Sequence, residues 1–165
     1  MRRPLVLTGG PGSGKTTTGR ALAESAEACA FIDGDDVRQL VVAGAAAPWE
    51  GPDGAWQREL GARNCAVLAD SFGAAGFECV VADVLTPRSL AIWREAVPDV
   101  LVVRLVLAPD AALARLGGRH PFITEDELGW LHAADLADPP AGDAVLEVEH
   151  LTPEQQRAAV ARLWR

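Results

Sequence analysis

The sequence predicts a three-layer α/β fold, with about five mostly parallel strands and helices on both faces of the sheet. Short apolar runs suited to buried strands alternate with helical stretches, as in consecutive βαβ units. The 165 residues, 49% of them hydrophobic, fit one domain that spans the chain and buries a sizeable core. The predicted strands are residues 5–8, 30–33, 78–83, 101–107 and 145–148.

The helices of this fold are predicted from cap residues and flanking loops. A helix over residues 16–26 follows the first strand after a glycine-rich loop. Thr86 precedes a proline at a first helical position, and Thr124 and Thr152 each stand three residues before a Glu or Gln, the spacing of a capping box. Residues 42–55 are rich in Gly, Pro and Ala, and we expect them to be irregular.

The composition of the chain limits the kinds of molecule that it is expected to bind. The net charge of −8 disfavours broad binding to nucleic acid or to an anionic membrane, because both need a basic surface, and it favours a small-molecule partner. No apolar stretch approaches the roughly 20 residues of a membrane span and the N-terminus lacks a signal-peptide pattern, so we expect a cytoplasmic protein. Cys29, Cys65 and Cys79 are expected to be reduced and buried.

The loop after the first strand carries the strongest motif. Residues 9–16 match G-x-x-x-x-G-K-[ST], and Lys15 is the only lysine of the chain. Main-chain N–H groups and the helix N-terminus would surround a phosphate, Lys15 would reach the terminal phosphates, and Thr16 would ligate Mg²⁺. The predicted fold is therefore a P-loop NTPase fold that binds ATP and Mg²⁺. The predicted nucleotide-binding residues of the loop are Gly9, Gly10, Pro11, Gly12, Ser13, Gly14, Lys15, Thr16 and Thr17.

An acidic cluster follows the second strand, at the edge where an open α/β sheet binds its ligands. We expect Asp35 to orient an acceptor hydroxyl and take its proton. Asp33 is expected to position the loop or to help hold metal-bound water, and Asp36 to cap the next helix. Arg38 is expected either to bind the acceptor or to neutralise Asp35. The alternative for this cluster is a solvated turn with a helix cap.

Two further residues, on later strands, stand out. Asp83 ends the third apolar run, where a Walker B carboxylate would hold a Mg²⁺ water beside Thr16; the alternative is an acid that only ends a strand. Arg104 interrupts the fourth strand, so a buried guanidinium there requires a carboxylate partner. That partner is not evident from the sequence.

The phosphate loop together with Asp33-Gly34-Asp35-Asp36-Val37-Arg38 resembles the small P-loop kinases that phosphorylate hydroxyls of small molecules, a group with adenylylsulfate kinase, gluconate kinase and chloramphenicol phosphotransferase. The matching acid of that family lies by the acceptor hydroxyl, which implies the same role for Asp35. The resemblance also implies a short lid near residues 115–123. It implies that Arg119 or Arg115 stabilises charge on the transferred phosphoryl group, that Arg115 binds nucleotide, and that residues 149–152 pass near the adenine. The alternative for the lid is a plain turn between two helices with exposed arginines.

The aromatic residues suggest where the acceptor lies. Trp49, Trp56 and Trp130 are expected to fill core space, with the wall of an acceptor pocket as the alternative. The acceptor itself stays open, as do a metabolic or an antibiotic-inactivating role and the choice between monomer and homodimer.

The sequence as a whole predicts an ATP-dependent phosphotransferase acting on a small-molecule hydroxyl. In this prediction Lys15, Asp35 and Arg119 are catalytic, Asp33, Asp35 and Arg38 bind the acceptor, and Thr16 and Asp83 hold the metal. One alternative is an NTP-binding switch or ATPase module acting on a protein partner. Another is a nucleoside or nucleotide kinase, which a base-stacking pocket around Trp49 or Trp56 would favour.

Overall fold

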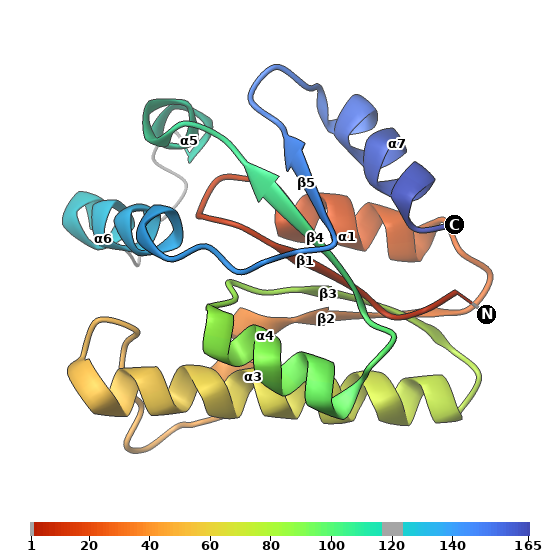
Figure 1. Ribbon diagram of the computed structural model, residues 1–165, viewed down its shortest axis with the longest axis horizontal. Coiled ribbons are helices and arrows are strands. Elements are labelled where there is room, and N and C mark those ends of the chain that lie inside the picture. The colour runs from red at the N-terminus through yellow and green to blue at the C-terminus, as the bar shows by residue number, and fades with distance from the viewer. Residues whose placement is uncertain (1, 117–123) are drawn as a thin grey trace.

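The computed structural model describes residues 2–116 and 124–165 and confirms the predicted three-layer fold (Figure 1). A five-stranded sheet with order β2-β3-β1-β4-β5 lies between two layers of helices, and each neighbouring pair of strands is parallel. The observed strands begin and end within one residue of the predicted ones. They are β1 (Leu5–Thr8), β2 (Cys29–Asp33), β3 (Glu78–Ala82), β4 (Leu101–Val106) and β5 (Ala144–Glu147).

The helices begin largely where the cap residues predict. Capping boxes start α4 at Thr86, α6 at Thr124 and α7 at Thr152. The expectation that residues 42–55 are irregular is wrong for their last part, because α3 begins at Gly51; Pro52 and Asp53 in its first turn suit a helix N-terminus. The helices are α1 (Lys15–Glu24), α2 (Gly34–Arg38), α3 (Gly51–Ala74), α4 (Pro87–Ala96), α5 (Pro109–Leu116), α6 (Glu125–Ala137) and α7 (Pro153–Leu163).

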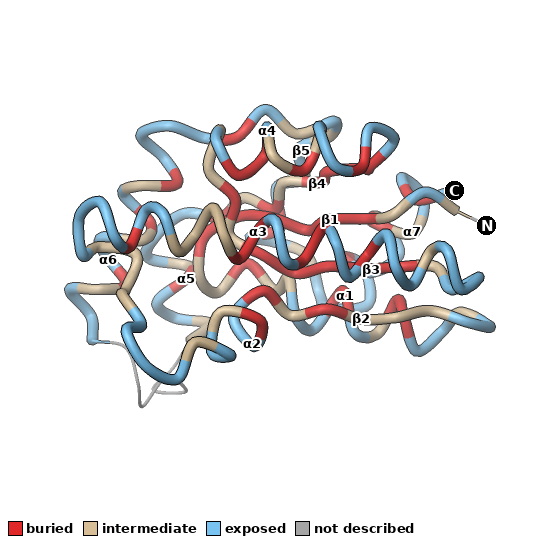
Figure 2. Tube along the Cα trace, turned by 90° about the horizontal axis from the view of Figure 1, so that it is seen from below, coloured by how far each residue is buried: buried red, intermediate tan, exposed pale blue. Residues whose placement is uncertain are grey.

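The sheet separates two hydrophobic cores. Successive side chains of a strand point to opposite faces, so Val6 joins the core beneath α3 and α4, while Leu5 and Leu7 join the core beneath α1 and α7. Each core holds one fully buried tryptophan, Trp93 in the first and Trp164 in the second. In Figure 2 the buried residues follow β1 and β3, and the exposed residues lie on the outer faces of the helices.

The carboxyl ends of three strands meet at one edge of the sheet. In the parallel register, Ala82 at the end of β3 is paired with Leu7 of β1 and with Asp33 of β2. The main-chain N–H of Asp83 donates to the Leu7 carbonyl at 3.0 Å. This edge therefore brings together the phosphate loop after β1, the acidic cluster after β2 and Asp83 after β3.

The cysteines are free thiols, and Cys65 and Cys79 are buried as expected. Cys29 is only half-buried, because it begins β2, one of the two edge strands of the described sheet, so the expectation of burial is wrong there. In the two described stretches of chain, no helix has the length and apolarity needed to cross a membrane.

Candidate active site

The phosphate loop joins β1 to α1. Gly9, Gly12 and Gly14 have positive φ angles, and Gly14 is the N-cap of α1. The first N–H groups of a helix have no partner inside the helix, so at this end they face whatever the loop surrounds. The helix dipole adds partial positive charge there. The loop and the helix start together form a site for an anion such as a phosphate.

The ammonium of Lys15 lies over its own loop. Its Nζ donates to the main-chain carbonyls of Gly9 at 2.8 Å and Gly10 at 2.9 Å. Burial lowers the pKa of Lys15, while nearby carboxylates, of which Asp35 and Asp83 have the largest effect, oppose the shift. A bound polyphosphate would supply the negative charge that this buried cation favours.

Asp33 connects the phosphate loop to the acidic cluster. Its Oδ2 accepts from the Thr16 hydroxyl at 3.1 Å, and its Oδ1 accepts from the main-chain N–H of Asp35 at 3.0 Å. The second bond makes Asp33 the N-cap of α2. The expectation that Asp36 caps this helix is therefore wrong: β2 ends at Asp33 and α2 begins at Gly34, so Asp36 lies inside the first turn.

Arg38 binds two carboxylates with one guanidinium. Its Nη2 lies 2.5 Å from Asp35 Oδ1, and its Nη1 lies 2.7 Å from Asp83 Oδ1. Burial alone would lower the pKa of Arg38, but the carboxylates of Asp83 and Asp35 raise it overall. The side chain of Asp83 is 1% exposed and that of Asp35 74% exposed, so the pair of contacts links a buried acid to one open to solvent.

Asp83 also accepts from the main-chain N–H of Val84 at 2.8 Å, which fixes its carboxylate at the end of β3. A Cβ atom at position 34 would lie 2.5 Å from Asp83 Oδ1, so only glycine fits between the acidic cluster and this carboxylate. The close approach explains the glycine in the Asp-Gly-Asp run. The carboxylate that contacts Thr16 is that of Asp33, and the metal role of Asp83 stays a prediction.

Beside this cluster lies a surface formed by Arg58, Trp49 and Trp130. The guanidinium of Arg58 lies 5.7 Å from the ring centre of Trp130, and the rings of Trp49 and Trp130 meet edge to face at 6.2 Å. Neither indole belongs to a core cluster and Trp56 is 59% exposed, so the expectation that these three fill the core is wrong. The tryptophans that fill the two cores are Trp93 and Trp164.

Arg58 has an unusual electrostatic setting. Among residues 2–116 and 124–165, no carboxylate forms an ion pair with it. Burial lowers the pKa of Arg58 and the charge of nearby Arg38 lowers it further, while the carboxylate of Asp83 opposes the shift. Gly61, one turn later on α3, lies against the Arg38 side chain, so Arg58 belongs to the helix face that borders the acidic cluster.

The carboxylate partner of Arg104 is Asp135 of α6. Arg104 Nη2 donates to Asp135 Oδ2 at 2.9 Å and to the Asp135 main-chain carbonyl at 3.1 Å. On the same helix, His132 lies against the phosphate loop, because a Cβ at position 10 would be 2.8 Å from its Nδ1. Burial lowers the pKa of His132. Together these contacts hold α6 over β4 and beside the loop.

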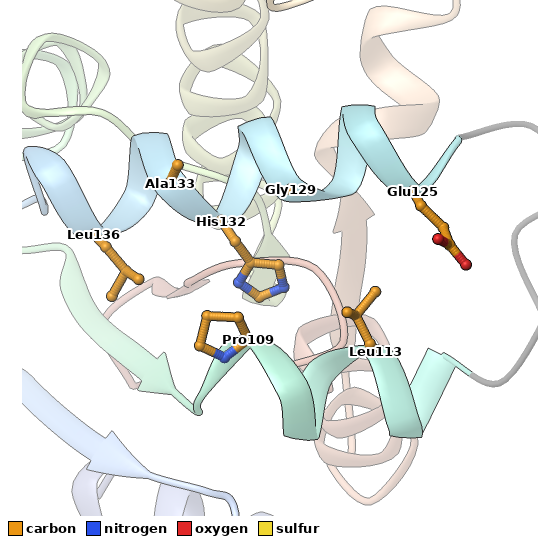
Figure 3. Close-up of a pocket in the computed structure, with 7 residues that line it drawn as sticks. All are labelled: Pro109, Leu113, Glu125, Gly129, His132, Ala133 and Leu136. Carbon is orange, nitrogen blue, oxygen red and sulfur yellow. The ribbon is translucent and has the colours of Figure 1, made fainter.

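A cavity of about 210 Å³ lies between α5 and α6. Figure 3 shows the His132 ring pointing from α6 toward Pro109, with Leu113 and Leu136 on either side. The lining of this cavity is mainly apolar, and the cavity lies apart from the acidic cluster.

Of the two candidate lid arginines, the structure describes Arg115. Arg119 lies outside the described residues, so its expected role stays a prediction. Arg115, near the end of α5, donates to the main-chain carbonyl of Val148 and to that of Glu149 at 3.0 Å. It is thus bonded to the segment between β5 and α7, where the family resemblance places the adenine.

Sequence reasoning missed three residues that border the site: Arg58, His132 and Gln156. Two of them carry a signal that could have found them. His132 follows buried Leu128 by four residues, and Gln156 precedes buried Val160 by four, so each polar side chain lies on the buried stripe of its helix. A polar residue on such a stripe needs an internal partner. Arg58 also lies on the buried stripe of its helix, four residues after buried Gly54 and three before buried Gly61, but these neighbours are glycines and give no apolar pattern in the sequence.

The comparisons with known proteins agree with this geometry at the level of fold. No family model matches the chain, and no curated protein does either. Among solved structures, a sugar kinase from Janibacter sp. is 23% identical with a TM-score of 0.75, covering 99% of this chain and 94% of that one. The chain has the fold of the small-molecule P-loop kinases.

Two other P-loop kinases of known structure superpose along almost the whole chain. A gluconokinase from Sinorhizobium meliloti is 21% identical with a TM-score of 0.66, covering 99% of this chain and 94% of that one. A shikimate kinase from Acinetobacter baumannii, solved with shikimate, is 24% identical with a TM-score of 0.64, covering 98% of this chain and 92% of that one. These superpositions support the predicted fold.

Proposed function

We propose that this protein is a kinase that transfers the terminal phosphate of ATP to a hydroxyl group of a small molecule. One observation carries the proposal: a single carboxylate, Asp33, bonds Thr16 of the phosphate loop with one oxygen and the main-chain N–H of Asp35 with the other. The residues suited to hold the donor and the acceptor are therefore fixed relative to each other. Holding two reactants in one geometry supplies much of the catalysis of phosphoryl transfer.

In the proposed reaction the acceptor hydroxyl lies against Asp35, whose side chain is open to solvent and oriented by Arg38. The hydroxyl oxygen forms a bond to the terminal phosphorus of ATP, and the bond from that phosphorus to its bridging oxygen breaks. ADP leaves with the electron pair, and the hydroxyl proton passes to the Asp35 carboxylate. Lys15, together with Arg119 as the lid arginine, neutralises charge on the phosphoryl oxygens.

Thr16 and Asp33 fit a magnesium ion. Magnesium prefers oxygen ligands, and here a hydroxyl and a carboxylate lie 3.1 Å apart at the start of α1. Asp83, at the end of β3, is the second acid that we assign to this ion. When bound, the ion neutralises phosphate charge. Asp33 and Thr16 position the loop for it, and Arg115 contributes to nucleotide binding by holding the segment after β5.

Arg58 points to an anionic acceptor. Its charge is partly desolvated and lies near another arginine, so a carboxylate or phosphate on the substrate would relieve an unfavourable setting. Trp130 offers a flat apolar surface beside it. Polyhydroxy acids and nucleoside monophosphates both combine a hydroxyl with an anionic group, so both belong in a screen for the acceptor.

The test is ADP release by the purified chain with Mg·ATP and a panel of such acceptors, each beside its uncharged analogue. We expect one class of anionic alcohol to stimulate turnover. Asp35→Asn should keep ATP binding and lower turnover by about 10²–10⁴-fold, the usual contribution of general base catalysis. Asp36→Asn, one residue away on the same short helix, is the matched control and should stay active. ATP hydrolysis that no acceptor stimulates would contradict the proposal and favour a switch module.

A further inference from the structure

Gln156 of α7 is a buried amide that binds the phosphate loop from behind. Its side-chain Nε2 donates to the main-chain carbonyl of Ser13 at 2.9 Å and to the Thr18 hydroxyl at 3.0 Å. The residue is 3% exposed. A carbonyl oxygen can only accept a hydrogen bond, so the amide group that faces Ser13 has to be the NH₂. Both N–H groups of this amide are therefore used, one on the loop and one on α1.

The bond to Ser13 fixes the direction of the next main-chain N–H. Ser13 C=O and Gly14 N–H belong to one peptide unit, and the described chain contains no cis peptide bond. In a planar trans peptide the C=O and N–H point in opposite directions. While Gln156 holds the Ser13 carbonyl on the α7 side, the Gly14 N–H points away from α7.

The packing leaves this peptide little freedom to rotate. Gly14 has a φ of +82°, and a Cβ there would lie 2.9 Å from Gln156 Nε2. Its carbonyl accepts the first helical bond of α1, from Thr18 N at 2.9 Å. Figure 1 shows α7 alongside α1 on the same face of the sheet, so Gln156 spans the contact between these two helices.

We propose that Gln156 is a positioning residue for the phosphate donor: by holding the Ser13 carbonyl it aims the Gly14 N–H at the bound polyphosphate. This inference rests on the proposed function in that the polyphosphate belongs to ATP. Gln156 itself touches no reacting atom. Its effect is on the affinity for the donor, in the ground state and the transition state alike, and not on the acceptor.

The test compares two neighbouring glutamines of α7. Gln156→Met keeps the volume and removes both donors. We expect the Kd for Mg·ATP and for tripolyphosphate, measured by calorimetry, to rise about 10- to 100-fold, as for a lost hydrogen bond to a charged group. The KM for ATP should rise by the same factor while the acceptor KM stays at its wild-type value. Gln155→Met is the control.

The control variant loosens α7 without touching the loop. Gln155 Oε1 accepts from Thr152 N at 2.9 Å in the capping box, and its side chain is exposed. Gln155→Met should lower the melting temperature and leave both Kd values unchanged. Equal affinity losses in the two variants, or unchanged affinity in Gln156→Met, would overturn the proposal.

The pH dependence of the Gln156→Glu variant distinguishes a positioning role of Gln156 from a merely structural one. A protonated carboxyl group can donate to the Ser13 carbonyl, whereas an ionised one cannot. The affinity of this variant for tripolyphosphate, relative to wild type, should therefore recover as the pH falls. A pH profile parallel to that of the wild type would contradict the proposal.

Wild-type protein labelled with ¹⁵N-glycine gives a test that needs no substitution. Adding tripolyphosphate should shift the Gly14 amide resonance and slow its hydrogen exchange, because the N–H gains an anionic acceptor. An unaffected Gly14 signal at saturating tripolyphosphate would overturn the proposal, as would a wild-type chain that binds neither polyphosphate. Tight ATP binding without transfer to any acceptor would instead contradict the proposed function and leave this inference standing.

Discussion

Replacing Arg38 by Met should destabilise the fold by about 3–5 kcal/mol, the usual effect of removing one partner of a buried ion pair. The reason is the carboxylate that stays behind. Asp83 is 1% exposed, and without Arg38 its remaining bond in the described structure comes from the main chain of Val84. For a chain of this size each kcal/mol changes Tm by about 2–4 °C, so the expected fall is about 6–20 °C.

The assay is thermal and urea unfolding of four proteins: wild type, Arg38→Met, Asp83→Asn and the double variant. The double variant should recover most of the stability lost in Arg38→Met, because the amide at position 83 carries no charge to strand and still accepts from Val84. Arg88→Met serves as control. The Arg88 guanidinium is 81% exposed beside Glu59, so the loss of that pair should hardly change Tm.

Two outcomes would refute this reasoning. Arg38→Met with the Tm of the wild type would mean that the pair contributes nothing to the fold. A double variant no more stable than Arg38→Met would mean that the loss comes from the missing side-chain volume of arginine and not from the buried charge of Asp83.

The remaining predictions concern the substrates. Arg58→Met should raise the KM for an anionic acceptor by about tenfold or more and leave the KM for ATP unchanged, since a charge-assisted bond is removed on the acceptor side only; steady-state kinetics with both substrates varied would show this, and an unchanged acceptor KM would refute it. Burial raises the pKa of Asp33 above its ordinary value of 3.8, so on acidification the carboxylate takes up its proton at a higher pH than an ordinary aspartate and Mg·ATP binding should weaken there. Asp33→Asn should bind Mg·ATP weakly and without this pH dependence. Titrations of the wild type and the variant with Mg·ATP over the same pH range test this, and parallel pH curves would mean that Asp33 plays no part.

Local patterns in the sequence predicted the strands, the caps and the phosphate loop, because each depends on neighbours in the chain. Apolar runs of four to six residues with turn signals between them define β1 to β5. A threonine with a partner three residues later starts α6 and α7. The P-loop motif fixes its own conformation through glycine positions, and so its place between β1 and α1 was predictable.

Contacts between distant segments were not predictable in the same way. The buried guanidinium of Arg104 required a carboxylate partner, but that partner lies 31 positions away on α6. This helix has several acidic residues, and the sequence alone did not distinguish between them. The Asp-Gly-Asp-Asp run offered three acids for one cap, and the choice depends on the residue at which β2 stops. Arg58 lies beside the site on the face of α3 where Gly61 packs against Arg38, a contact between distant segments that no local sequence pattern records.

The separation of the two cores has a consequence for how this fold changes its chemistry. The residues proposed to bind the phosphate donor are anchored in the layer of α1 and α7, and those proposed to bind the acceptor are anchored in the layer of α2 and α3. The sheet isolates one layer from the other, and Asp33 joins them at its edge. If the proposed function holds, we expect acceptor specificity to change through substitutions in α2, α3 and the segment between them, while ATP recognition stays intact.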